Sequence, residues 1–471
     1  MPFDLLAAAR HEMIERGFEP DLPAPALQQA QSLQPAHGTG LEDLGGLLWS
    51  SIDNDESRDL DQIEWAERVP GGIRVLVAIA DVDALVERGT PIDAHASHET
   101  TTVYTGIHTF PMLPERLSTD LTSLNEDQDR AAIVIEMVVD ANGDIASSRV
   151  FRANVRNRAQ LTYSGVGPWL DGSAPAPAKV AASPDLDAQL RVQNEVAHHL
   201  RAARDRKGAL TFDRQEAEAI VHDGQVKAIE ARRANSASRL IEDFMIGANE
   251  VMARTLRDRG VTSIRRVVKA PERWPRIMEL AERYGEKLPP QPDAAALNAF
   301  LVARKHNDPD HYHDVSLAVL KLMGSGEYVA ARPGDEQPGH FGLAAHDYTH
   351  STAPNRRFAD LVTQRLLKSK PYSDDELDAI ARSCTSMENA ARKVQRDMAK
   401  RIAAVAVQSR IGEEFAAVVT GVTPKGVFVR VANPPIEGRL MRGDQGLDVG
   451  DRIRVRLEST DPERGFIDFV R

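Results

Sequence analysis

Cysteine is almost absent from this chain of 471 residues, in which Cys384 is the only one. A single thiol excludes internal disulfides and cysteine-rich zinc sites. No run of about 18 apolar residues occurs, which excludes a membrane-spanning helix, and the first residues lack the pattern of a signal peptide. We therefore expect a protein of the cytoplasm, a reducing compartment in which disulfides are rare.

Positive charge is also in deficit. The chain has 58 Lys and Arg against 70 Asp and Glu, a net charge of −12, which argues against wholesale electrostatic attraction to nucleic acid. Two segments are nevertheless basic: residues 254–276 hold eight basic and two acidic residues, and residues 392–410 hold six and one. Such stretches are usually solvated helix faces, so they acquire a functional meaning only beside a nucleic-acid site.

What is present is ample apolar material, 42% of the residues, enough for two to four domains at roughly 100–200 residues each. The pattern predicts an α+β protein in three parts. Residues 1–38 form short helices, 39–411 form a large domain, and 412–471 form four or five short strands typical of an OB-type β-barrel. Within the large domain we expect strands at 71–82 and 131–140 and helices at 186–207, 237–259, 314–324, 356–369 and 374–411.

The densest chemical signal is an acidic segment, SSIDNDESRDLDQIEW, at residues 50–65. Its carboxylates are Asp53, Asp55, Glu56, Asp59 and Asp61. Crowded carboxylates repel one another unless a cation neutralises them, and short Asp side chains on a loop suit a hard, oxygen-seeking cation. A magnesium site and a solvated acidic turn both fit this pattern. A calcium loop fits less well, because the EF-hand spacing of Gly and Glu is missing.

Two further segments suggest an anionic, base-bearing ligand. In YTHSTAPNRRFADLVTQRLLK (348–368), Pro354 precedes an Arg pair at the start of an amphipathic helix, where a cation opposes the helix dipole unless an anion binds there. An ordinary surface pair is the alternative.

In VYTGIHTFPMLP (103–114), Tyr104 and Phe110 flank a Gly turn. Such aromatic residues either stack on bases or fill the core.

Taken in order, these segments resemble the RNB catalytic domain of the ribonuclease II family of exoribonucleases. The resemblance spans about residues 40–405. It is carried by IDNDESRDLDQ, VAIADV, Tyr104 before PMLP, SLNEDQDRA, LTY, GALTFDR, SRLIEDFMIGAN, HFGLA and YTHSTAPNRRFADL. The C-terminal segments GVTPKGVFVRV, EGRL and VGDRIRVRL resemble the S1-type RNA-binding barrel that follows RNB in this family. The fold implied is a mixed sheet surrounded by helices.

The resemblance implies a magnesium site, with manganese as a possible substitute. The family motif is Asp-x5-Asp-x-Asp-Asp; Asp53, Asp59 and Asp61 match its first three positions and Gln62 departs from the fourth. An amide oxygen can coordinate a metal or hold its water but removes one negative charge, which puts a second ion in doubt. Asp55 or Glu56 would then be the compensating carboxylates.

The resemblance also assigns substrate contacts. Arg356 matches the arginine that grips the scissile phosphate and acts with Asp61 in catalysis, Tyr104 matches the aromatic that stacks on terminal bases, and Phe212 its stacking partner. Glu242 and Gln395 fall at positions used near the 3′ end of the RNA. In the barrel we expect RNA contacts from Lys425, Phe428, Arg430 and Arg439.

The family usually places two cold-shock barrels before RNB, and about 40 residues cannot hold even one, so we expect a helical element in their place. The resulting expectation is a magnesium-dependent 3′-to-5′ exoribonuclease. It would digest single-stranded RNA processively to nucleoside 5′-monophosphates, as a monomer that needs neither a protein partner nor a membrane. Two alternatives stay open: an RNB-type RNA-binding protein with impaired catalysis, supported by Gln62, and a hydrolase of small nucleotides, which would leave the barrel without a ligand.

Overall fold

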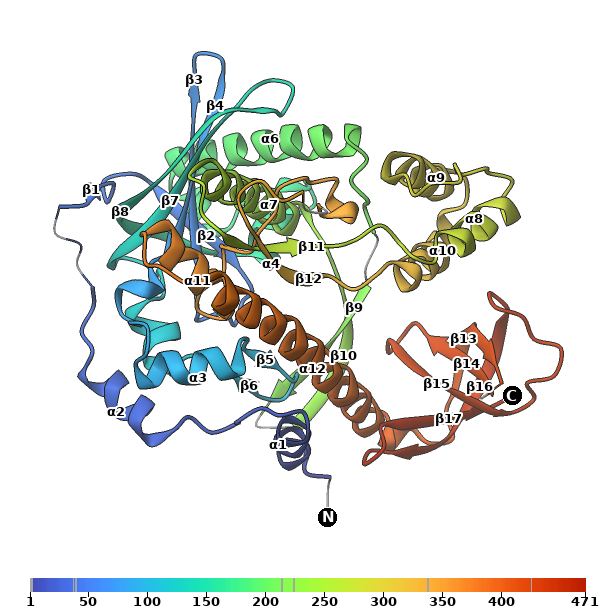
Figure 1. Ribbon diagram of the computed structural model, residues 1–471. Coiled ribbons are helices and arrows are strands. Elements are labelled where there is room, and N and C mark those ends of the chain that lie inside the picture. The colour runs from blue at the N-terminus through green and yellow to red at the C-terminus, as the bar shows by residue number, and fades with distance from the viewer. Residues whose placement is uncertain are drawn as a thin grey trace.

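A central sheet and its helices, a small helical lobe and a C-terminal barrel make up the molecule (Figure 1). The structure, a computed structural model, describes residues 3–36, 38, 40–212, 215–222, 225–336, 339–424 and 426–471. The predicted α+β class is confirmed. Among the described residues, no helix combines the length and the apolar character needed to cross a membrane.

The central sheet has six strands in the order β1-β8-β2-β3-β4-β7, and β7 also pairs with β8. Its strands are β1 (Glu42–Asp43), β2 (Trp49–Asp53), β3 (Gln62–Val69), β4 (Gly72–Ala80), β7 (Asp129–Val139) and β8 (Ile145–Thr162). The expected strands at 71–82 and 131–140 are thus present as β4 and β7. Both are buried over most of their length, as apolar runs without alternation predict.

The 18-residue strand β8 is a surprise, because its many Arg, Asn and Ser residues hide its strand character. Its first part pairs antiparallel with β7 and its last part pairs parallel with β2, so it joins both ends of the sheet. The turn between β7 and β8 requires glycine: Gly143 has φ +81°, and a Cβ there would lie 1.9 Å from the carbonyl oxygen of His199.

Helices cover the sheet. The helices α4 (Tyr163–Leu170), α6 (Pro184–Arg206) and α7 (Ser236–Asp258) pack on its strands. Strand β3 pairs with β2 only at Ser50 and Glu64, so the backbone N–H and C=O groups further along this edge of β3 have no partner there in any strand that the structure describes. Gln189 of α6 binds one such pair of groups: its side chain accepts from the Ala66 N–H at 3.0 Å and donates to the Ala66 carbonyl oxygen at 2.5 Å. An edge that is covered in this way cannot pair with another chain.

The long helix α12 (Asp374–Ala406) crosses the molecule from the neighbourhood of α11 (Phe358–Leu367) to the barrel (Figure 1). Ser373 and Glu376 form a capping box at its start, which satisfies the first backbone N–H groups. The N-terminal α1 (Leu5–Glu15) packs on α12, with Glu12 accepting from Arg401 at 2.7 Å. The short helices expected at the N-terminus, α1 and α2 (Ala24–Ser32), are therefore present.

The helices α8 (Trp274–Arg283), α9 (Ala294–Asn307) and α10 (Pro309–Leu322) form a lobe with its own apolar cluster. Two ribbons complete this half of the chain: β9 (Gln215–His222) pairs with β10 (Gln225–Arg233), and β11 (Ser263–Val267) with β12 (Glu327–Ala331). The smaller elements are α3 (Pro91–Glu99), β5 (Val103–Tyr104), β6 (Thr109–Phe110) and α5 (Ala178–Ala181).

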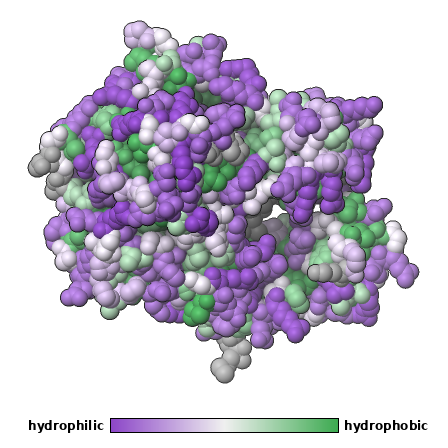
Figure 2. Space-filling model, viewed as in Figure 1, coloured by the Kyte–Doolittle hydropathy of each residue, from purple (hydrophilic) through white to green (hydrophobic). Residues whose placement is uncertain are grey.

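The last 58 residues form a closed five-stranded barrel, as predicted. Its strands are β13 (Glu414–Thr423), β14 (Gly426–Val431), β15 (Ile436–Arg442), β16 (Arg452–Asp461) and β17 (Phe466–Val470). Ala404 and Val407 at the end of α12 join the barrel core, and Arg430 of β14 pairs with Asp314 of α10 at 3.1 Å. Figure 2 shows the surface hollowed between the α8–α10 lobe and the barrel.

Candidate active site

The acidic segment forms the loop between β2 and β3. Asp53 is the last residue of β2, and its Oδ1 accepts from the Asn54 N–H at 2.7 Å and the Ser57 hydroxyl at 3.0 Å. Leu60, which is buried, pins the loop: its N–H donates to Ser123 Oγ at 2.9 Å, and its carbonyl accepts from the Leu124 N–H at 2.9 Å. Buried Leu60 thus sets the positions of Asp59 and Asp61 on either side of it.

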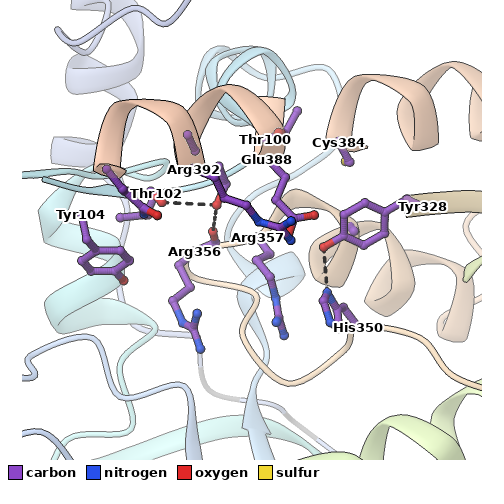
Figure 3. A pocket seen from close by; sticks show the side chains of 14 residues that line it. Thr100, Thr102, Tyr104, Tyr328, His350, Arg356, Arg357, Cys384, Glu388 and Arg392 are labelled. Carbon is purple, nitrogen blue, oxygen red and sulfur yellow. Dashed lines mark hydrogen bonds and ion pairs between the residues drawn. The ribbon is translucent and has the colours of Figure 1, made fainter. Parts of the chain in front are cut away.

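The two arginines of the second motif have different environments. Arg357 is bound to Asp360, with its Nε and Nη2 donating at 2.9 and 2.7 Å, and Asp360 also accepts from the Ala353 N–H at 2.8 Å. Arg356 projects into a pocket with 44% of its side chain exposed (Figure 3). Asp360 therefore fixes the loop, and Arg356 is the cation offered to a ligand.

The arginine loop and the acidic loop meet although they are distant in sequence. The backbone N–H of Asn355 donates to Asp61 Oδ1 at 3.0 Å, across 294 residues, and Arg356 Nε lies 3.4 Å from Asp61 Oδ2. The Arg356 carbonyl oxygen accepts from the Thr102 N–H at 3.0 Å. Tyr104, two residues further on, donates from its hydroxyl to Asp59 Oδ2 at 3.3 Å. Four predicted residues therefore lie together: Asp59, Asp61, Tyr104 and Arg356.

The pocket beside them has a volume of about 220 Å³. Its lining includes Tyr104 and Arg356 from these loops, Tyr328 and His350, and Gln395 from α12. Tyr104 is 41% exposed, so its ring is available for stacking. Figure 3 shows Tyr104, Tyr328 and His350 around Arg356. The Tyr328 hydroxyl and the His350 Nδ1 share a hydrogen bond of 2.7 Å.

Burial dominates the electrostatics of the acidic loop. Asp61, which is 2% exposed, has its pKa raised to about 7 by burial, an effect that Arg356 opposes and the charge of Asp59 increases. Burial also raises the pKa of Asp59, with Asp53 adding to the shift and Arg356 opposing it. Burial and mutual repulsion thus disfavour the charged forms of Asp59 and Asp61, and the Arg356 guanidinium opposes this only in part.

A hard cation suits this set chemically, since all three side chains offer carboxylate oxygens. Within the described part of the chain, however, no three His, Cys, Asp or Glu side chains converge closely enough to hold a metal ion. Asp55 Oδ1 accepts a hydrogen bond from the Ser164 hydroxyl at 2.6 Å, so this oxygen is engaged away from the three aspartates. Gln62 opens β3 and is buried; its side chain makes no hydrogen bond to the aspartates.

The remaining predicted residues lie elsewhere. Phe212 packs against the cluster of the α8–α10 lobe, and Glu242 is exposed on α7; neither lines the pocket. Phe428, Arg430 and Arg439 lie on β14 and β15, with Phe428 directly opposite Arg439 on the outer surface of the barrel. Lys425 falls outside the described residues. The stacking and RNA contacts assigned to these residues stay predictions.

Sequence reasoning missed the residues that hold the site together. Asn355 contributes its backbone N–H to Asp61, and its side-chain oxygen accepts from Thr122 at 2.6 Å. Asp360 holds both Arg357 and Ala353. The ion pair of Arg357 with Asp360 could have been predicted from the sequence, because the two residues are three positions apart at the start of a helix and such residues are neighbours on its surface.

Comparison with known proteins agrees with this geometry. The RNB domain family matches residues 41–371, and the RNase II-type exonuclease C-terminal S1 domain matches residues 413–471. Ribonuclease R 1 of Lactococcus lactis is 30% identical over 457 residues, covering 89% of this chain and 55% of the relative. This chain therefore spans about half the length of that curated relative.

Solved structures share the fold. Mycoplasma genitalium RNase R in complex with ribose methylated single-stranded RNA superposes with a TM-score of 0.89 at 23% identity, covering 99% of this chain and 78% of the other. Yeast Ssd1, a pseudonuclease, superposes with a TM-score of 0.73 at 17% identity, covering 92% of this chain and 55% of the other. By the family matches along most of its length, this chain belongs to the RNB domain family, of the ribonuclease II type with a C-terminal S1 barrel.

Proposed function

We propose that this protein is a 3′-to-5′ exoribonuclease that hydrolyses single-stranded RNA to nucleoside 5′-monophosphates. The observation that carries the proposal is the contact of Arg356 and the Asn355 N–H with Asp61, which joins an exposed guanidinium to a buried carboxylate. Family membership and the relatives named Ribonuclease R support it. We further propose that it acts in the cytoplasm, as a monomer.

We assign Asp53, Asp59 and Asp61 to a magnesium ion, with Gln62 beside them and manganese as a substitute. A bound divalent ion lowers the pKa of its water and stabilises negative charge at a phosphoryl centre. The raised pKa values of Asp59 and Asp61 favour this assignment, because a nearby cation stabilises the charged form of a carboxylate that burial disfavours. Ion binding would draw the three side chains together.

The protein's own groups then bind and orient the RNA. Arg356 provides donors in a planar fork that match phosphate oxygens, and the Asp360 bonds hold its loop in place. Tyr104 offers a ring face to the terminal bases, a sequence-tolerant contact. Gln395 lines the same pocket from α12 and is placed to contact the 3′-terminal nucleotide.

The test uses single-stranded RNA labelled at its 5′ end, incubated with magnesium and the full chain. We expect a product that shortens to a few nucleotides, with mononucleotides released, and no shortening by Asp61→Asn, which removes the charge but keeps the shape. Asp55→Asn is the matched control, since Asp55 is bound to Ser164, and should remain active.

The second candidate function is RNA binding without catalysis. Gln62 in place of a fourth carboxylate favours it, and the likeness to a pseudonuclease shows that the fold occurs without the activity. Intact RNA with both the wild type and Asp61→Asn, together with a gel shift shared by both, would establish this second function and reject the first.

A further inference from the structure

A second cavity, of about 480 Å³, lies behind the catalytic pocket. It is bounded by the β11–β12 ribbon, the end of α7 and the segment before the arginine loop. Pockets for small organic ligands begin at about 300 Å³, so this cavity is large enough for one. Arg266 and Tyr348 line it, and Arg266 binds Glu388 of the catalytic pocket through two bonds of 2.6 and 2.9 Å. The two cavities therefore share a wall.

Arg265 in this cavity lacks a hydrogen-bonded partner among the described residues. It is 6% exposed, and its guanidinium donates no hydrogen bond to any residue that the structure describes. Its Nη1 is buried and lies 3.8 Å from the nearest carboxylate oxygen, on Asp347, whose other oxygen is bound to Arg257. Burying a cation without hydrogen-bonded compensation is costly, and burial lowers the pKa of Arg265 accordingly.

Four arginines line the cavity, and carboxylates bind three of them through hydrogen bonds. Arg257, Arg265, Arg266 and Arg332 line it, against Asp335, Glu336 and Asp347. Asp335 and Glu336 are exposed at its edge, and Arg332 is held by Asp374 and Asp378 from α12. Arg265 is thus the one arginine of this lining whose guanidinium makes no hydrogen bond to a carboxylate among the described residues. The remaining lining combines the largely apolar Val261, Val267, Ala331, Pro333 and Tyr348 with His346 and two glycines.

We propose that this cavity binds a nucleoside 5′-monophosphate, with its phosphate on Arg265 and its base against the apolar lining. A phosphomonoester supplies the acceptors that Arg265 lacks, and the apolar lining suits a base. The choice of a mononucleotide rests on the proposed function, because such an enzyme releases that product on the other side of the shared wall. The site is separate from Arg356 and Tyr104.

The test is direct binding of 5′-AMP to the full chain by calorimetry, in EDTA so that no metal recruits AMP to the acidic loop. Adenosine and inorganic phosphate are the comparison ligands. We expect one AMP per chain, with both comparison ligands binding at least about tenfold more weakly. Arg265→Met should weaken AMP binding by about tenfold or more, the usual cost of a lost charged hydrogen bond. Arg356→Ala, which alters only the catalytic pocket, should leave AMP affinity unchanged.

Removing a buried charge whose one ion pair in the described part of the chain is the 3.8 Å contact with Asp347 should leave the fold intact, which thermal unfolding of Arg265→Met will check. If that variant is destabilised, Arg257→Gln, at a half-exposed side chain of the same cavity, is the second variant and should also weaken AMP binding. The proposal is overturned if AMP does not bind, if only Arg356→Ala weakens it, or if phosphate binds as tightly as AMP. Because AMP binding needs no hydrolysis, these results are independent of whether the exoribonuclease assay succeeds.

Discussion

At the scale of single residues, burial separates side chains of the same type. Arg356 and Arg357 are adjacent and both line the pocket, yet Arg357 is bound to Asp360 whereas Arg356 has 44% of its side chain exposed. Asp53, Asp55 and Asp61 come from one loop, yet only Asp61 is buried against the arginine loop. The functional assignment of each residue therefore depends on its partner as well as on its type.

Tyr104 gives the residue-scale prediction. Tyr104→Ala should weaken single-stranded RNA binding by about 1–3 kcal/mol, the usual worth of one stacked base, which is roughly 5- to 150-fold in Kd. Tyr104→Phe should bind nearly as well as the wild type, because it keeps the ring and loses only the 3.3 Å bond to Asp59. Fluorescence anisotropy in an Asp61→Asn background measures both without degradation. Equal losses in the two variants would show that the hydroxyl, rather than the ring, is what matters.

At the scale of elements, helix α12 has two kinds of surface. Val394 and Met398 are buried, Gln395 lines the catalytic pocket, and Lys393 and Arg396 are exposed with no ion pair among the described residues. On a chain with a net charge of −12, such exposed cations would give the RNA of the proposed function a local path that the overall charge does not.

The element-scale prediction concerns salt. If Lys393 and Arg396 contact phosphates, Lys393→Gln and Arg396→Gln should each lower the slope of log Kd against log salt by about 0.7, the value per phosphate on a single strand. The slopes come from anisotropy titrations at several salt concentrations. Arg191→Gln on α6, where Arg191 pairs with Asp187, is the control and should not change the slope. A slope unchanged in the two α12 variants would exclude α12 from the RNA path.

At the scale of the whole molecule, the barrel and the α8–α10 lobe flank a hollow (Figure 2) and are joined by Arg430 and Asp314. The outer barrel surface with Phe428 and Arg439 is available for RNA. Under the proposed function, this arrangement would give RNA a second contact away from the catalytic pocket, which long substrates reach and short ones do not.

A chain ending at residue 411 should therefore bind long single-stranded RNA more weakly while still hydrolysing a short oligomer. Deletion also bares Ala404 and Val407, which pack into the barrel, so the double variant Phe428→Ala with Arg439→Gln in the full chain is the milder comparison. Affinity and cleavage are measured for a long and a short RNA. Undiminished affinity for the long RNA in both proteins would refute this role of the barrel.

The sequence by itself determined much of this protein. Apolar runs specified β4 and β7, regular strand spacing specified the barrel, and the acidic and arginine motifs identified Asp59, Asp61 and Arg356, because these signals are local. Tertiary structure decided the rest. It placed Phe212 against the α8–α10 lobe, made a strand of polar β8 and left Arg265 without a hydrogen-bond partner among the described residues. It also brought Asn355 to Asp61 across 294 residues. Burial and pairing at such distances depend on how the whole chain packs, which no local pattern encodes.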